Sequence, residues 1–164
     1  MVSRNFEAIL QCLSNHNVRF IVVGALSAVL NGAPMNTFDV DIVHSTDPEN
    51  VDRLLDALDA LDAFYRLQPE RRLRPGASHL TSSGHQMLMT KYGPLDVLGH
   101  IGRNHTYTDL INHSVELELA DGLKIRVLDL ETLITVKEEV GGEKDIAALP
   151  TLRSVLKEQR REKG

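Results

Sequence analysis

Two aspartates separated by a single residue, Asp39 and Asp41, interrupt one apolar stretch of the sequence, and a third, Asp96, interrupts another. In a β-strand, residues i and i+2 point to the same face, with Cα atoms about 6.5 Å apart. Two carboxylates on one face can converge on a hard cation such as Mg²⁺, which prefers oxygen ligands in octahedral geometry. The same spacing also arises on an exposed strand face without any function, so the pair alone leaves both interpretations open.

The surroundings of the aspartates favour a metal site. Aspartate is depleted in strands because its side chain competes for backbone hydrogen bonds, yet Asp39 and Asp41 lie in an alternating run that is typical of a strand. Asp96 lies on another predicted strand. Three carboxylates from two strands can hold metal ions about 4 Å apart, as in-line phosphoryl and nucleotidyl transfer require. The sequence therefore predicts that Asp39, Asp41 and Asp96 bind Mg²⁺ or Mn²⁺, in a transferase or a phosphohydrolase.

A glycine turn upstream of the aspartates is a candidate phosphate site. The apolar run at residues 20–23 ends at Gly24, where a helix is predicted to begin. A strand-to-helix turn leaves free backbone N–H groups at the helix N-terminus, and these can hold a phosphate. Ser27 lies in the first turn of that helix and either adds a hydroxyl donor or is simply a serine near a helix start.

Hydrophobic periodicity and turn signals predict the elements that position these residues. Strands are predicted at 20–23, 39–43, 86–90, 95–98, 115–119 and 124–127, with Asp121-Gly122 as a hairpin turn. Helices are predicted at 5–17, 25–30, 48–61, 107–112, 129–137 and 146–156, the last kinked or restarted at Pro150. Residues 66–83 are predicted to form a long loop. This order predicts an α+β fold with a mixed β-sheet flanked by helices.

Composition and charge fit one folded domain. The chain has 164 residues, a formal net charge of −5 and one cysteine, Cys12, which excludes an internal disulfide. We expect the domain to span residues 1–157 and a charged C-terminal tail to occupy 158–164. No apolar run approaches the roughly 20 residues that cross a bilayer. The first residues lack the pattern of a secretory leader, so we expect a cytoplasmic protein without a membrane partner.

Three motifs surround the aspartates and the glycine turn. The first reads VVGALS at 22–27 and NGAPMNTFDVD at 31–41, the second TKYGPLDVL at 90–98, and the third LETLITVK at 130–137, followed by Gly141 and Lys144-Asp145. In this order they resemble the minimal nucleotidyltransferases of the DNA polymerase beta superfamily. The branch that the chain is most similar to is the small prokaryotic group related to toxin–antitoxin and abortive-infection enzymes. The resemblance implies a single-domain nucleotidyltransferase fold over roughly residues 6–156.

The resemblance also implies a reaction and roles for individual residues. The reaction is transfer of a nucleoside monophosphate from a nucleoside triphosphate to a hydroxyl of a protein, a tRNA or a small molecule. Asp39 and Asp41 would bind the metal ion and the nucleotide phosphates, and Asp96 would help deprotonate the attacking hydroxyl. The remaining nucleotide-binding candidates are Gly24, Ser27, Thr37, Lys137 and Lys144, the lysines because an ammonium stabilises charge on the leaving pyrophosphate. Thr37 alternatively favours the strand, and each lysine alternatively lies on a solvated helix face.

Several positions depart from the family pattern. Ala25 stands where relatives usually have glycine or serine, Asn31 where many have histidine, and Met35 where they have arginine. Gly142 and Glu143 stand where an Arg-Pro pair is frequent. These departures support an alternative function, a non-catalytic binding module of the same fold, for example one component of a toxin–antitoxin pair that binds its partner protein.

Two further groups of residues are interpreted without a catalytic role. Arg66, Arg71, Arg72 and Arg74 form a local basic cluster in an acidic protein, which either receives a polynucleotide phosphate or forms a solvated loop, the favoured interpretation. The seven histidines show no metal-binding helix motif, and surface or loop positions are favoured for them. His85 and His100 flank the strands of the third carboxylate, so either is also a candidate to line the cleft.

Overall fold

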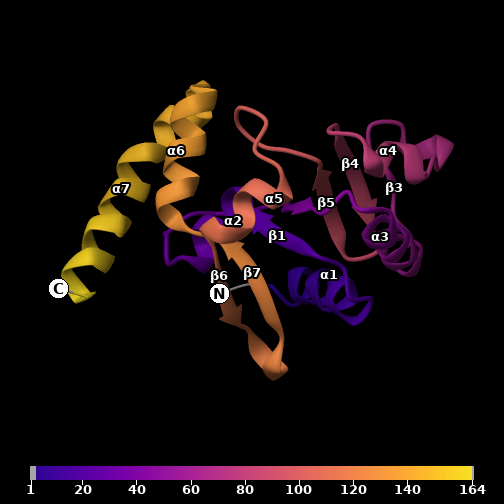
Figure 1. Cartoon of the computed structure of the whole chain (residues 1–164), viewed down its shortest axis with the longest axis horizontal. Coiled ribbons are helices and arrows are strands. Elements are labelled where there is room, and N and C mark those ends of the chain that lie inside the picture. Colours follow the sequence, from indigo (N-terminus) through magenta and orange to yellow (C-terminus); the bar gives the residue numbers. More distant parts are fainter. Residues whose placement is uncertain (1–2, 164) are drawn as a thin grey trace.

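The computed structural model describes residues 3–163, in which helices and strands alternate before a strand-rich section and two final helices (Figure 1). The helices are α1 (Arg4–Asn15), α2 (Gly24–Leu30), α3 (Pro48–Ala60), α4 (Ala77–Thr81), α5 (Tyr107–Leu110), α6 (Leu130–Val140) and α7 (Glu143–Lys163). The strands are β1 (Phe20–Val23), β2 (Val40–His44), β3 (Phe64–Tyr65), β4 (His85–Thr90), β5 (Gly93–Leu98), β6 (Ser114–Glu118) and β7 (Lys124–Leu128). None of these helices is both long and apolar enough to span a bilayer.

The strands form one mixed sheet in the order β3-β4-β5-β2-β1-β7-β6. Strand β1 is antiparallel to β2 and parallel to β7, and β2 is parallel to β5. The hairpins β4–β5 and β6–β7 extend the sheet at either side, and β3 adds a short antiparallel edge. The predicted α+β class, with a mixed sheet flanked by helices in one domain, is confirmed.

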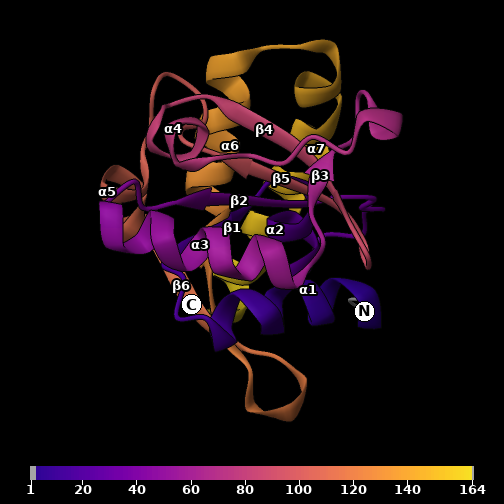
Figure 2. The ribbon, with the colours of Figure 1, turned by 90° about the vertical axis from the view of Figure 1, so that its right-hand side faces the viewer.

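Helices cover both faces of the sheet (Figure 2). Alternation of side chains along the strands divides the core into two clusters, one on each face. On one face, Val22 and Ile42 are buried in a cluster with residues of α1 and α3. On the other, Ile21 and Val23 are buried in a cluster with residues of α6 and α7. Because side chains alternate along a strand, Asp41 lies on the α6–α7 side of the sheet, opposite to its neighbours Val40 and Ile42.

Local sequence signals explain where two of the elements begin and end. The side chain of Asp129 accepts a hydrogen bond from the Thr132 amide (2.7 Å) and so caps the start of α6. Gly141 ends that helix in the left-handed conformation, at φ +67°. The hairpin between β6 and β7 turns through Asp121 and Gly122, both at positive φ, as the sequence predicts.

The structure differs from the sequence predictions at β3, which was not predicted, in the stretch predicted as a loop, and in α7. The stretch predicted as a long loop contains a turn of 3₁₀ helix at Pro69–Arg71 and the helix α4. Helix α7 continues through Pro150 without a break, its buried Leu149 and Leu152 packed in the same cluster as α6. Residues 158–163 of the predicted tail are the last turns of α7, and residues 1, 2 and 164 lie outside the described part of the chain.

The start of α7 carries an exposed apolar residue. Ile146 is 56 % exposed, although its spacing from the buried Leu149 would place it near the same helix face. It lies close to the α6–α7 turn, where Val140 is also 57 % exposed, and this end of the helical pair projects past the sheet (Figure 1). Periodicity fixes the face of a helix but not how far the neighbouring layer extends along it.

Candidate active site

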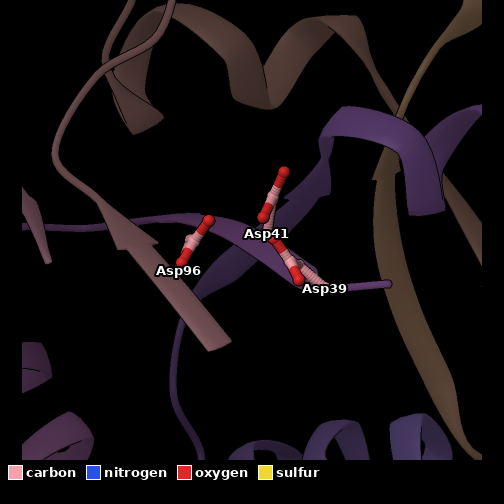
Figure 3. A group of neighbouring side chains, drawn as sticks. All are labelled: Asp39, Asp41 and Asp96. Atoms are coloured by element: carbon pink, nitrogen blue, oxygen red, sulfur yellow. The ribbon is translucent and has the colours of Figure 1, made fainter. Parts of the chain in front are cut away.

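The three aspartates predicted to bind metal lie together at the junction of β2 and β5 (Figure 3). Parallel pairing places Asp41 directly opposite Asp96, and Asp39 lies just before the start of β2. Each residue offers one carboxylate oxygen, and these oxygens lie within 4.8 Å of one another. The predicted convergence of carboxylates from two strands is therefore confirmed in the structure.

The electrostatics of Asp41 fit a cation at this position. Burial, with the neighbouring Asp96 and Asp39 carboxylates, raises the pKa of Asp41 from 3.8 to about 7. Its Oδ1 atom is fully buried and has no hydrogen-bond partner among residues 3–163. A divalent cation would provide the counter-charge and the missing partner, and an all-oxygen donor set suits Mg²⁺ or Mn²⁺. The residues present therefore fit the metal that the sequence predicts.

Gly24 permits a close approach of the backbone to Asp41. It begins α2 at φ +66°, and Val23 before it pairs with Asp41 across β1 and β2. A Cβ atom on Gly24 would collide with the Asp41 carboxylate, since it would lie 3.0 Å from Cγ and closer still to Oδ2. The chain needs glycine here both for the positive φ and for the space that the carboxylate occupies.

Arg66 belongs to the site, and its interpretation as part of a solvated loop is wrong. Its guanidinium contacts Asp96, with Nη1 2.5 Å from Oδ1, and lies 3.8 Å from Asp39 through Nη2. The side chain is only 18 % exposed. The other cluster arginines point elsewhere: Arg71 donates to Gln68, Arg72 lies over the Phe64 ring, and Arg74 pairs with Asp59 and Asp62.

Few features of the sequence indicate that Arg66 belongs to the site. Arg66 follows β3, a strand of two residues that carries no detectable alternation. Its amide donates to the Met87 carbonyl (3.1 Å), which extends the contact with β4 by one residue. The signal that could have found it is a cation directly after two aromatic residues, Phe64 and Tyr65, ahead of an otherwise irregular stretch.

The two predicted hydroxyl ligands are engaged with the backbone of the site. Ser27 is fully buried, and its Oγ donates to the Gly24 carbonyl at 2.6 Å. Thr37 donates through Oγ1 to the carbonyl of Asp39 at 3.0 Å. Each hydroxyl therefore fixes the main chain next to a site residue, and direct phosphate contact by either remains a prediction.

The two predicted lysines lie where α6 and α7 meet. Lys137 pairs with Asp145 (Nζ to Oδ1, 3.2 Å) and is 17 % exposed, whereas Lys144 is exposed at the start of α7. Asp145 thus contacts Lys137 and not its sequence neighbour Lys144. Within residues 3–163, neither lysine forms an ion pair with the three aspartates, so their role toward a triphosphate stays a prediction.

The histidines that flank the third carboxylate contact each other. The rings of His85 and His100 are 4.9 Å apart, and His85 Nε2 lies 3.1 Å from the His100 carbonyl oxygen. In the part of the chain that the structure describes, the only group of three or more potential metal ligands is the aspartate cluster, so these histidines do not join it.

Comparison with known proteins identifies the fold. No family model matches the sequence, and no curated protein matches it either. Among solved structures, a Thermotoga maritima protein provisionally assigned as a nucleotidyltransferase is similar, with a TM-score of 0.59 and 22 % identity over 94 % of this chain and 92 % of that one.

Two antibiotic-modifying enzymes are similar in structure as well. The lincosamide antibiotic adenylyltransferase LnuA, solved with lincomycin, has a TM-score of 0.62 and 17 % identity over 94 % of this chain and 98 % of that one. ANT(2″)-Ia, solved with adenylyl-2″-tobramycin, has a TM-score of 0.60 and 13 % identity over 96 % of this chain and 90 % of that one. At these identities the likeness concerns the fold, and the chain has the nucleotidyltransferase fold with an acidic cluster that could bind a metal ion.

Proposed function

We propose that the protein is a metal-dependent nucleotidyltransferase that moves a nucleoside monophosphate from a nucleoside triphosphate to a hydroxyl acceptor. The observation that carries this proposal is the convergence of Asp39, Asp41 and Asp96 within 4.8 Å on adjacent parallel strands of a nucleotidyltransferase fold. The buried, unpartnered oxygen of Asp41 supports it, because burying a carboxylate is costly unless a cation compensates the charge.

The three aspartates would have different roles in this reaction. Asp39, Asp41 and Asp96 would hold Mg²⁺ or Mn²⁺, which when bound polarises the α-phosphate and neutralises developing charge. Asp96 would accept the proton of the acceptor hydroxyl, whose oxygen bonds to the α-phosphorus as the bond to pyrophosphate breaks. Gly24 and the start of α2 would lie against the triphosphate, and Thr37 keeps Asp39 in place through the Asp39 carbonyl.

A small-molecule hydroxyl is the first acceptor to assay. LnuA and ANT(2″)-Ia, which are similar in fold, were solved with lincomycin and with an adenylylated tobramycin. This likeness supports a small acceptor, and a protein side chain and the 3′ end of a tRNA follow as the next acceptors to assay.

A binding module without catalysis is the second candidate function. It is favoured by Ala25, which lacks a hydroxyl, and by Ser27, whose hydroxyl is already bonded to the Gly24 carbonyl. In this function the partner would be a protein, as in a toxin–antitoxin pair. The two candidates differ in whether the protein binds a nucleoside triphosphate with Mg²⁺.

Calorimetric titration of each nucleoside triphosphate, with and without Mg²⁺, distinguishes the two candidates. We expect binding that requires both the metal and Asp39, so that Asp39→Asn abolishes it while the fold persists. Asp52→Asn, which removes an exposed carboxylate on α3, is the matched control and should bind as the unmodified protein does. A folded protein that binds no triphosphate would favour the module, and phosphate release without any acceptor would indicate a phosphohydrolase.

A further inference from the structure

One cation lies inside the acidic site, and it comes from a segment outside the three sequence motifs. The guanidinium of Arg66 bridges two of the three carboxylates, 2.5 Å from Asp96 Oδ1 and 3.8 Å from Asp39 Oδ2. The side chains of Arg66 and Asp96 are 18 % and 15 % exposed, so water screens this contact far less than it screens a surface ion pair.

The protein backbone holds this arginine in position. The Arg66 amide donates to the Met87 carbonyl, and Nη1 donates to the Leu88 carbonyl at 3.0 Å. Met87 in turn pairs with Asp96 across β4 and β5. The strand that carries Asp96 and the strand that anchors Arg66 are therefore neighbours, and the guanidinium is directed at the carboxylates by the sheet.

A metal ion and this guanidinium would compete for the same carboxylates. Asp96 Oδ1 is the atom that Arg66 contacts, and Asp96 and Asp39 both belong to the set that could hold the metal. A divalent cation held by these carboxylates would place a second positive charge beside the guanidinium, and like charges repel strongly in a partly buried site. The Arg66 contact would therefore loosen when a metal binds.

A guanidinium released from the carboxylates could bind the phosphates of the nucleotide. A guanidinium forms two parallel hydrogen bonds to phosphate, which a lysine cannot do. Of the two lysines predicted to neutralise the triphosphate, Lys137 is already paired with Asp145 and Lys144 is exposed at the start of α7.

We propose that Arg66 is the resident cation of this site: it neutralises Asp39 and Asp96 when no metal is bound, and it contacts the nucleotide phosphates once a metal takes over those carboxylates. The inference rests on the proposed function and names a residue that binds the substrate. It predicts that removing the guanidinium has opposite effects on the two ligands, tighter binding of the metal alone and weaker binding of the metal–nucleotide complex.

Titrations with Mn²⁺ alone, and with a non-hydrolysable α,β-methylene nucleoside triphosphate in saturating Mg²⁺, test this prediction. In Arg66→Gln we expect Mn²⁺ affinity to rise several-fold and nucleotide affinity to fall by about tenfold or more, as loss of a charged hydrogen-bonding group implies. Arg66→Lys keeps the charge but loses the pair of parallel N–H donors. Its nucleotide affinity should therefore lie between those of the unmodified protein and of Arg66→Gln. Arg71→Gln removes the same charge from an exposed position nearby and corrects for long-range electrostatics.

Two other outcomes of these titrations would overturn the inference, and they differ from each other. If both affinities fall in Arg66→Gln and in Arg66→Lys, the arginine has a structural role; if neither changes relative to Arg71→Gln, it takes no part in binding. In both cases the proposed function survives, because the unmodified protein still binds metal and nucleotide. If the unmodified protein binds no Mn²⁺, the proposed function itself fails, and the inference fails with it.

Discussion

The sheet has two halves that differ on the same face. Over β1 and β7 this face is apolar, and Ile21 and Leu128 are buried with Leu133 and Leu152 of the α6–α7 pair. Over β2 and β5 the same face carries Asp41 and its neighbours, and Asp39 is 39 % exposed there. We call these the covered half and the acidic half.

At Val23 and Asp41 the boundary between the halves runs between two adjacent strands, whereas further along β2 Val43 belongs to the apolar cluster. Val23 on β1 and Asp41 on β2 are paired in register, one in the apolar cluster and the other in the carboxylate cluster. One sheet thus carries an apolar cluster and a carboxylate cluster on the same face. This contrast predicts that substitutions on one side of this boundary change stability, whereas substitutions on the other change ligand binding.

The largest effect on stability is expected in the covered half. Leu133 is 2 % exposed, so Leu133→Ala should lower the free energy of unfolding by about 2–5 kcal/mol through lost burial and a cavity. Urea denaturation measures this change, and Mn²⁺ affinity of the folded fraction should stay constant. Ile146→Ala on α7, at a side chain that is 56 % exposed, is the matched control and should change stability little. A large loss of metal affinity in Leu133→Ala would contradict the separation of the halves.

In the acidic half, Asp41→Asn should raise stability, whereas Leu133→Ala in the covered half should lower it. The neighbouring carboxylates and burial disfavour the charge on Asp41. Removing that charge should stabilise the metal-free protein at pH 8 while abolishing Mn²⁺ binding. Thermal unfolding in EDTA, followed by a Mn²⁺ titration, measures both quantities. A variant that is less stable than the unmodified protein at pH 8 would show that the charge on Asp41 does not destabilise the metal-free protein.

The raised pKa of Asp41 makes the stability of the metal-free protein depend on pH. The folded-state pKa of Asp41 is raised from 3.8 to about 7, so the folded protein binds this proton more tightly than the unfolded chain does. Its contribution to stability is therefore complete below pH 4 and is lost as pH rises through 7, with a slope of up to about 1.4 kcal/mol per pH unit. Unfolding in EDTA across this range should show the slope, and Asp41→Asn should lack it. Mn²⁺ affinity should change in the other direction and rise with pH, because the metal binds the ionised carboxylate.

The smallest effect concerns α2, the helix that both halves share. Its first residue lies against Asp41, whereas Asn31 after its last residue donates to the carbonyls of Ser27 (2.8 Å) and Leu128 (3.0 Å). Asn31→Ala should lower the free energy of unfolding by about 1 kcal/mol, the usual contribution of such hydrogen bonds. Asn36→Ala, at an exposed position, is the control for comparison by urea denaturation. An effect on Mn²⁺ affinity larger than that on stability would show that α2 transmits strain to the site.

The strands and carboxylates were predictable because their signals are local and periodic. The run at Phe20–Val23 and the alternation around Asp41 each define a strand within a few residues. Alternation also placed Asp39 and Asp41 on one face, whereas the pairing of β2 with β5, which brings Asp96 to them, is not encoded locally.

Contacts that depend on tertiary pairing were not predictable in the same way. Arg66 reaches the carboxylates because a two-residue strand docks on β4, and no periodic pattern reports so short a strand. The pairing of Lys137 with Asp145 depends on how α6 and α7 pack, which no local pattern in the sequence reports. Burial of Ser27 likewise follows from the depth at which α2 sits against the sheet.

The register of β2 against β5 has a consequence for how the chain folds. Both hairpins, β4–β5 and β6–β7, join strands that are adjacent in sequence and can form early, but β2 and β5 are far apart in the chain and pair in parallel. A slip of one residue would turn Asp96 toward α1 and α3 and bring Leu95 to the carboxylates. Only the native register brings the three carboxylates together. A divalent cation that binds them during refolding would therefore stabilise chains in the native register relative to chains in a shifted one.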